Sequence, residues 1–170
     1  MAAKIRALQY GCGPIGCGVA KLASQRRDID LVGAIDIAPD KVGKDLGEVA
    51  GLGRRLGVTI SSDSDAVLSR VKPDIVFHTT SSWLNKVYGQ LTPIIKAGVN
   101  IVSTTEELSF PWQKQPKLAG EIDQLAKENK VTVLATGVNP GFLMDTWPLA
   151  MTAVCQEVKR VRVARIQDAS

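Results

Sequence analysis

Short apolar segments alternate with longer amphipathic ones along most of the chain, and Gly, Pro or charged residues separate them. The short segments are rich in Val and Ile, which favours strands, whereas apolar residues recur at helical spacing in the longer ones. Asp63 and Gly98 stand where helix caps belong. Strands are predicted over residues 4–10, 29–36, 58–60, 74–78, 100–103 and 131–134. Helices are predicted from the turn after the first strand to residue 25, around residues 66–68, and over residues 84–97, 118–129 and 145–155.

The order of these elements predicts a parallel sheet. Strands and helices alternate, and the strands are apolar on both faces, as in sheets that helices cover on both sides. We therefore expect an α/β fold, a Rossmann-like doubly wound parallel sheet forming one domain over residues 1–145. Over residues 146–170, a helix interrupted by Pro148 precedes an imperfect strand pattern from Val158 to Ile166. That strand has no predicted partner, so we expect a linking helix and the first strand of a truncated second α+β domain.

Composition and charge exclude several classes of protein. The chain has 170 residues, 45% of them hydrophobic, and no apolar run approaches the roughly 20 residues that a membrane helix needs. The net charge of +4 is scattered apart from a late cluster at residues 159–165, without the basic face and stacking aromatics of nucleic-acid binders. Residues 1–6 lead straight into a strand and lack the apolar stretch of a signal peptide, so a cytoplasmic protein is expected.

Cysteine and histidine are too few to favour a metal site. Cys12, Cys17 and Cys155 make an odd number of cysteines, which indicates free thiols in a reducing compartment. His78 is the single histidine of the chain, so a zinc site would lack its usual ligands. We expect no metal.

A glycine-rich turn follows the first predicted strand and opens the first helix. Its residues are Gly11, Cys12, Gly13, Pro14, Ile15 and Gly16. In the pattern G-x-G-x-x-G, the first glycine permits the tight turn, the second lets the backbone approach a pyrophosphate, and the third lets the helix pack on the strand. The helix N-terminus adds free N–H groups and partial positive charge. The turn predicts a dinucleotide site rather than an ordinary strand-to-helix turn. A methyltransferase usually has an acid just before the first glycine, where this chain has Gln9 and Tyr10.

An acid completes this pattern. Asp36 ends the second predicted strand about 20 residues after Gly16, where a carboxylate can accept hydrogen bonds from an adenosine ribose. No Arg or Lys follows it directly, so a 2′-phosphate would meet repulsion, and NAD is favoured over NADP. NADP stays open as an alternative, because Lys41, Arg26 and Arg27 could soften that preference.

Polar segments follow the last three predicted strands, at the edge of the sheet where ligands bind in open α/β folds. They cover residues 78–83, 103–112 and 136–145 and are rich in hydroxyl, glycine and amide groups, which suit a ribose and a nicotinamide carboxamide. The candidate cofactor contacts in them are Thr79, Thr80, Ser81, Thr104 and Asn139. We interpret His78 as a hydrogen-bonded residue at a strand end rather than a base.

Two adjacent glutamates form the candidate catalytic pair. Glu106 and Glu107 come just after a buried strand, where carboxylates are costly unless they are solvated or used. The alternative is a structural role at the N-terminus of a short helix, whose dipole favours negative charge. Trp83 and Trp112 beside them are interpreted as packing residues or pocket lids.

The motifs together resemble those of a known family. The matching segments are residues 11–16, 40–48, 78–83, 105–112 and 139–145. The glycine turn is generic, whereas Glu-Glu-Leu-x-aromatic-Pro-Trp at 106–112 and Asn-Pro-Gly-Phe at 139–142 are more specific. The sequence resembles the N-terminal half of 2,4-diaminopentanoate dehydrogenase and the native amine dehydrogenases. More distantly, it is similar to the dihydrodipicolinate reductase superfamily.

This resemblance implies NAD(P)-dependent oxidative deamination of an amine or diamino acid, or the reverse reductive amination of a ketone. It also implies a catalytic glutamate after the fifth strand, which is Glu106 or Glu107, with Glu106 favoured. Family members are about twice as long, and their second domain closes the substrate pocket and carries much of the subunit contact, so a homodimer is implied for the full-length protein. The alternatives are an imine reductase of the dihydrodipicolinate reductase type and a noncatalytic nucleotide-binding module.

Overall fold

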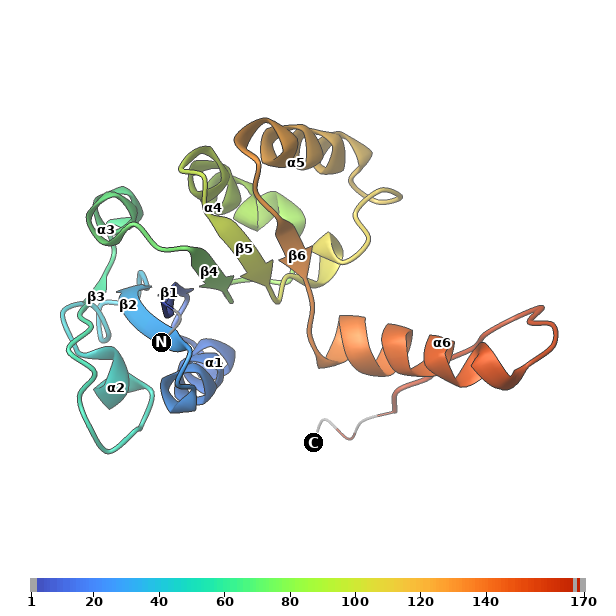
Figure 1. Ribbon diagram of the computed structural model, residues 1–170, viewed down its shortest axis with the longest axis horizontal. Coiled ribbons are helices and arrows are strands. Elements are labelled where there is room, and N and C mark those ends of the chain that lie inside the picture. The colour runs from blue at the N-terminus through green and yellow to red at the C-terminus, as the bar shows by residue number, and fades with distance from the viewer. Residues whose placement is uncertain (1–2, 167, 169–170) are drawn as a thin grey trace.

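The computed structural model describes residues 3–166 and 168, and it contains a six-stranded parallel sheet with helices on both faces (Figure 1). The strands are β1 (Ile5–Tyr10), β2 (Ile29–Ile35), β3 (Ile60–Ser61), β4 (Ile75–His78), β5 (Asn100–Ser103) and β6 (Val133–Ala135). The helices are α1 (Pro14–Gln25), α2 (Leu46–Val49), α3 (Ser64–Val71), α4 (Leu84–Lys96), α5 (Pro116–Asn129) and α6 (Trp147–Met151). The expected Rossmann-like α/β fold is confirmed.

The strand order is β3-β2-β1-β4-β5-β6, and β1 pairs with both β2 and β4. The chain therefore adds strands first on one side of β1 and then on the other. Leu8, Val76 and Ile101 of the three central strands are almost fully buried, as expected for strands that helices cover on both sides. At the carboxyl end of β1, the chain segments after β1 and β4 lie together, joined by the hydrogen bond from Thr79 N to Tyr10 O at 2.8 Å. Ligands of open α/β folds bind at such a reversal point.

The helix ends follow from single residues that the sequence identifies. The carboxylate of Asp63 accepts a hydrogen bond from Ala66 N at 2.9 Å and caps α3. Gly98, with φ of 73°, ends α4 in the left-handed conformation that glycine adopts easily. Pro14 opens α1 at its first turn, where its missing N–H costs little.

Helix α2 was not expected, because residues 40–57 show no clear hydrophobic periodicity. A buried carboxylate organises this segment: Asp45 accepts hydrogen bonds from Gly47 N, Leu56 N and Gly57 N at 2.8 Å and from Val58 N at 3.1 Å. Burial raises the pKa of Asp45, but these four N–H groups outweigh it, and the pKa is lowered. The charged form of one side chain thus fixes a loop that hydropathy alone cannot predict.

The C-terminal segment agrees only in part with the sequence-based prediction. The helix expected at residues 145–155 is present over residues 145–154, as the end of a π-helical stretch (Val138–Thr146), the short α6 and a 3₁₀ turn at Thr152–Val154. The strand expected from Val158 to Ile166 is not formed, because a strand needs a hydrogen-bonding neighbour and no described strand pairs with this segment. Residues 138–151 project away from the sheet (Figure 1). Within the described residues, no helix has the length and apolarity to cross a membrane.

Candidate functional site

The glycine turn between β1 and α1 is tightly packed on its inner side and open on its outer side. Gly11 has φ of 91°, and a Cβ there would stand 2.7 Å from Thr79 O. A Cβ at Gly16 would overlap with Gly11 O and stand 2.6 Å from Thr79 Oγ1. At Gly13, by contrast, no described atom lies within 4 Å of the Cβ position. The turn therefore leaves room for a ligand to approach the backbone at Gly13, beside the N-terminus of α1.

The side chain of Gln9, at the end of β1, holds this turn in place. Gln9 was not identified as a site residue in the sequence analysis. Its side chain is fully buried, and Nε2 donates to Gly11 O at 2.8 Å and to Thr79 Oγ1 at 2.9 Å. Thr79 Oγ1 in turn donates to Gly11 O at 2.8 Å. The Gln9 Oε1 atom is buried without a partner among the described residues. No local sequence signal reveals this role, because Thr79 is 70 residues away from Gln9 in the chain.

Asp36 lies beside the glycine turn, at the end of β2. Oδ2 accepts a hydrogen bond from Cys12 N at 2.7 Å, and Oδ1 accepts one from Ala38 N at 2.8 Å. The Lys41 ammonium lies 3.6 Å from Oδ2. Burial raises the pKa of Asp36, but the two N–H groups and the lysine outweigh burial, so the pKa is lowered and the carboxylate is charged at neutral pH.

Cys12 is enclosed between this carboxylate and the sheet. Burial, followed by the charges of Asp36 and Cys17, raises the pKa of the Cys12 thiol to about 12, against a smaller opposing effect of Lys41. Burial also raises the pKa of Cys17, whose Sγ donates to Cys12 O at 3.2 Å. Thiols with raised pKa values are poor nucleophiles, so the surroundings of Cys12 favour a packing role for its side chain.

Three adjoining cavities follow the carboxyl edge of the sheet. The glycine-loop cavity, about 370 Å³, is lined by Tyr10, Gly11, Gly13, Asp36, Ile37, Lys41, Thr79, Thr80, Ser81, Lys86 and Gln90. The middle cavity, about 580 Å³, shares residues 79–81 with it and adds Ile15, Thr104 and Asn139. The outer cavity, about 790 Å³, shares Ser82, Glu106, Ser109, Asn139 and Pro140 with the middle one. The three cavities form a continuous series from Asp36 to Glu106.

The two glutamates have different surroundings. Glu106 is exposed, lines both the middle and the outer cavity, and accepts a hydrogen bond from Ser82 Oγ at 3.0 Å. Glu107 is half-buried and accepts a hydrogen bond from Leu84 N, the first residue of α4, at 3.0 Å. Glu107 also lines the outer cavity. The geometry thus separates a solvent-facing carboxylate from one that is engaged with a helix end.

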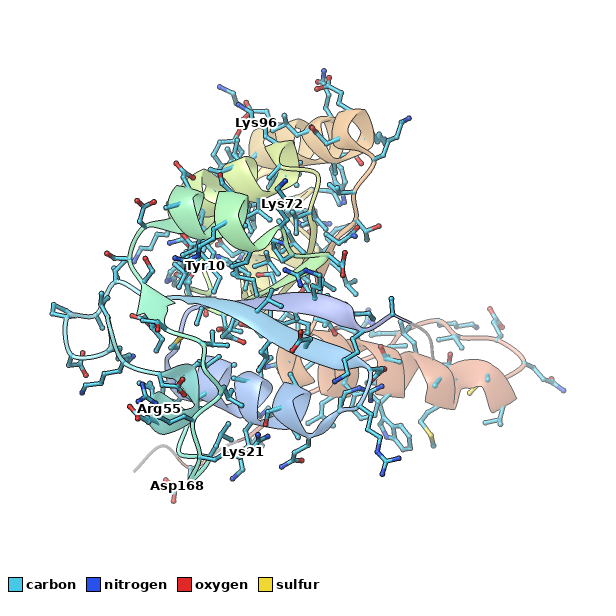
Figure 2. All side chains as sticks on the ribbon, turned by 60° about the vertical axis from the view of Figure 1, so that its left-hand side comes forward. Tyr10, Lys21, Arg55, Lys72, Lys96 and Asp168 are labelled. Atoms are coloured by element: carbon cyan, nitrogen blue, oxygen red, sulfur yellow. The ribbon has the colours of Figure 1, made fainter. Side chains whose placement is uncertain are left out.

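A buried polar network supports the wall of the glycine-loop cavity. His78 is fully buried, with Nε2 2.8 Å from Gln90 Oε1 and Nδ1 3.0 Å from Ser103 Oγ. Thr80 Oγ1 donates to the same Gln90 oxygen at 2.7 Å. Tyr10, which lies between the sheet and the helices above it in Figure 2, packs edge-on against the His78 ring at 5.4 Å. These contacts agree with the interpretation of His78 as a hydrogen-bonded residue.

Most of the residues singled out in the sequence lie along this cleft. Gly11, Gly13, Asp36, Thr79, Thr80 and Ser81 line the glycine-loop cavity, and Ile15, Thr104, Asn139, Glu106 and Glu107 line the next two. Cys12, Pro14 and Gly16 belong to the turn without lining any of these cavities. The cavity residues that the sequence did not single out include Lys86, Gln90, Ser109 and Lys114. Among the described residues, no three His, Cys, Asp or Glu side chains gather in a group that could hold a metal ion.

Comparison with known proteins decides the family. Residues 5–136 match the model of the N-terminal domain of dihydrodipicolinate reductase. The chain belongs to this family. Its domains bind NAD(P), which agrees with the position of the glycine turn and Asp36.

Two relatives are similar over most of the chain, and a third over little more than half of it. A 2,4-diaminopentanoate dehydrogenase from Acetoanaerobium sticklandii is 32% identical over 98% of this chain and 47% of its own length. The structure of an amine dehydrogenase from Mycobacterium smegmatis superposes with a TM-score of 0.82 at 38% identity, over 89% of this chain and 44% of that one. A 4-hydroxy-tetrahydrodipicolinate reductase from Nostoc is 34% identical over 57% of this chain and 36% of its own length. The chain thus spans about half the length, or less, of the relatives that it matches.

Proposed function

We propose that the chain is the cofactor-binding half of an NAD(P)-dependent oxidoreductase that converts an amine to an imine and then a ketone, or catalyses the reverse reductive amination. The observation that carries this proposal is the position of Glu106, which lines both the middle and the outer cavity. A carboxylate there lies between the space suited to a nicotinamide and the space left for a substrate. The similarity to a 2,4-diaminopentanoate dehydrogenase and to an amine dehydrogenase supports the same chemistry.

The residues of the first two cavities fit a nicotinamide dinucleotide. The open backbone at Gly13 and the N-terminus of α1 suit the pyrophosphate, and the charged Asp36 suits the hydroxyl groups of the adenosine ribose. The hydroxyl and amide groups of Thr104 and Asn139 in the middle cavity suit the nicotinamide end. The dinucleotide would supply the hydride acceptor or donor of the reaction.

Glu106 would act as the base. In the oxidative direction, an ammonium substrate must lose a proton before its carbon can lose hydride, and the Glu106 carboxylate can accept that proton. The same charge then stabilises the iminium cation that develops as hydride leaves. In the reductive direction, the protonated carboxyl group returns the proton as water leaves the carbon. Ser82 Oγ, which donates to Glu106 Oε1, would hold the carboxylate in place.

A second candidate function is supported by the family match and the Nostoc relative, namely reduction of a cyclic imine as in 4-hydroxy-tetrahydrodipicolinate reductase. The two candidate functions differ in the substrate and use the same cofactor-binding half of the protein. In a protein that extends this chain to the length of its relatives, oxidation of a free amine with NAD would support the first function. Reduction of a cyclic imine alone would support the second.

The cofactor half is tested by titrating the chain with NADH, using Gly16→Ala and Gly18→Ala as a matched pair. A Cβ at Gly16 would overlap with Gly11 O, whereas at Gly18 no described atom lies within 4 Å. We expect saturable NADH binding by the wild type, a loss of at least about tenfold in affinity for Gly16→Ala, and unchanged affinity for Gly18→Ala. Circular dichroism and thermal unfolding check that each variant is folded. Absence of binding by the folded wild type, or equal loss in both variants, contradicts the proposed site.

A further inference from the structure

A buried amide with an unpaired oxygen lies against the glycine turn. Gln9 belongs to β1, and its side chain is fully buried. The side-chain atom that faces Gly11 O must be the amide nitrogen, because a carbonyl oxygen can only accept a hydrogen bond. The other end, Oε1, is buried without a partner among the described residues. A buried polar atom without a partner destabilises a fold, so the presence of this amide needs an explanation in what its N–H groups do.

The N–H groups of Gln9 hold one peptide unit of the turn by its oxygen. One group donates to Gly11 O at 2.8 Å, and the other donates to Thr79 Oγ1 at 2.9 Å. The Thr79 hydroxyl donates to the same Gly11 oxygen at 2.8 Å. The Gly11 carbonyl is therefore turned into the protein by two donors, and one of these donors is itself held by Gln9.

The nitrogen side of the same peptide unit contacts Asp36. The bond between Gly11 and Cys12 is trans, and in a planar trans peptide the N–H points away from the C=O. The inward Gly11 carbonyl thus directs the Cys12 N–H to the opposite side, where it donates to Asp36 Oδ2 at 2.7 Å. One rigid peptide therefore connects the buried amide with the carboxylate that lines the glycine-loop cavity.

Asp36 keeps capacity for a ligand in this arrangement. Oδ2 accepts from Cys12 N, and Oδ1 accepts from Ala38 N at 2.8 Å. These two contacts fix the plane of the carboxylate, and each oxygen can still accept a further hydrogen bond. If the Cys12 N–H turns away, one of the two contacts is lost and the carboxylate is free to rotate. The orientation of Asp36 thus depends on how firmly the Gly11 carbonyl is held.

We propose that Gln9 is a positioning residue of the cofactor site: through the peptide between Gly11 and Cys12, it orients Asp36 toward the 2′-hydroxyl of the adenosine ribose. This inference rests on the proposed cofactor site and adds to it a residue that touches no ligand. Without the amide, Thr79 alone holds the Gly11 carbonyl, and Asp36 loses its fixed orientation. The rest of the nucleotide still binds at the open backbone of the glycine turn.

The test is calorimetric titration of the 170-residue chain with adenosine 5′-diphosphate (ADP) and 2′-deoxy-ADP, which differ only in the hydroxyl that Asp36 would bind. Gln9→Met and Gln9→Leu remove the N–H groups and keep an apolar side chain of similar size. Gln124→Met is the control, since it makes the same change at an exposed position of α5. We expect the wild type and Gln124→Met to prefer ADP by about tenfold, the usual worth of a hydrogen bond to a charged group. In both Gln9 variants the preference falls to about threefold or less, and in Asp36→Ala it disappears.

A second measurement needs no ligand. The Cys12 N–H is one of the groups that lower the pKa of Asp36, so the loss of that contact should raise this pKa. Carbon-13 NMR of the carboxyl groups follows the titration of Asp36 in the wild type and in each folded variant. We expect a higher pKa of Asp36 in Gln9→Met and Gln9→Leu than in the wild type, and an unchanged one in Gln124→Met. A residue that only fills space in the strand would not move it.

The outcomes separate the inference from its basis. If the folded Gln9 variants keep the wild-type preference for ADP, or keep the wild-type pKa of Asp36, the positioning role is wrong and the cofactor site stands. An equal loss of affinity for both nucleotides would mean that Gln9 only stabilises the turn, which also overturns the inference. The same change in Gln124→Met would show a general effect and overturn it as well. If the folded wild type does not bind ADP, or Asp36→Ala keeps the preference, the proposed cofactor site fails and the inference fails with it.

Discussion

At the scale of single residues, His78 has both ring nitrogens engaged in hydrogen bonds. Nε2 lies 2.8 Å from Gln90 Oε1 and Nδ1 lies 3.0 Å from Ser103 Oγ, whose hydroxyl donates to Thr105 Oγ1 at 2.9 Å. Burial lowers the pKa of His78, and the Gln90 hydrogen bond opposes this only in part. A neutral imidazole therefore supports Thr80 and Gln90, which line the glycine-loop cavity.

The lowered pKa of His78 predicts a dependence of stability on pH. Between the folded pKa and the ordinary value of 6.5, the unfolded chain binds the proton more readily than the folded one. The free energy of unfolding is therefore fully maintained above about pH 6.5 and falls as the pH drops below it. Since the chain has a single histidine, its imidazole proton signal in NMR titrates without overlap. We expect a midpoint below 6.5, and a midpoint at or above 6.5 would contradict the neutral network.

The sequence predicts residues whose role is set by the backbone conformation of a local turn. It does not predict residues whose role depends on contacts between distant parts of the chain. Gly11 and Gly16 are needed wherever a strand turns tightly into a helix, so their spacing was sufficient. Gln9 acts through Thr79, and Gln90 acts through His78, across strands and helices far apart in the chain. Such contacts form only once the order of the strands in the sheet is set, so no local sequence pattern predicts them.

At the scale of elements, the start of α4 depends on a carboxylate from another part of the chain. Trp83, which precedes α4, provides no side-chain cap, and Glu107 accepts the Leu84 N–H at 3.0 Å instead. Removing that acceptor leaves an N-terminal N–H group of α4 without its partner and a partial positive charge without its counterpart. The adjacent Glu106 makes no backbone contact of this kind in the described residues.

Substitution of the two glutamates should therefore have different results. We expect Glu107→Ala to lower the free energy of unfolding by about 1 kcal/mol, the usual cost of a lost helix cap, and Glu106→Ala to change it by less than about 0.5 kcal/mol. Denaturant unfolding measures both. In a protein extended to the length of the relatives, Glu106→Gln should reduce turnover with nearly unchanged cofactor affinity. Equal losses of stability, or full turnover in Glu106→Gln, would remove the division of roles.

Helices and strands that have a strong hydrophobic periodicity and pack within the sheet or against it were predicted well. The strand expected at residues 100–103 is β5, and the helix expected at 84–97 is α4 to within one residue. Helix α2 was missed because its order comes from the four hydrogen bonds of Asp45 rather than from hydropathy. The strand expected at Val158–Ile166 is not formed among the described residues, where no strand pairs with it, and its place in a second domain stays a prediction.

At the scale of the whole molecule, burial divides the chain into two unequal parts. The core runs through β1, β4 and β5 and the helices that pack on them. In contrast, none of residues 138–166 is buried, and the side chains of Phe142, Trp147 and Leu149 are more than half exposed. Apolar surface of this kind is typical of an interface, and it supports the proposal that residues 146–170 lead into a second domain. The homodimer implied by the family resemblance stays a prediction for the full-length protein.

The contrast in burial predicts two levels of amide hydrogen exchange. Amides of β4 and β5 open only with the whole sheet, because Val76 and Ile101 are buried at its centre. Amides of residues 147–166 are held by little tertiary packing, so we expect them to exchange at least about a hundredfold faster. Added NADH should slow exchange around the glycine turn and residues 79–81 without changing residues 155–166. Mass spectrometry of peptic fragments measures both effects and locates the boundary, expected near residue 145. Protection of residues 147–166 equal to that of β5 would mean that they belong to the same cooperative unit as the sheet, and the division at residue 145 would be wrong.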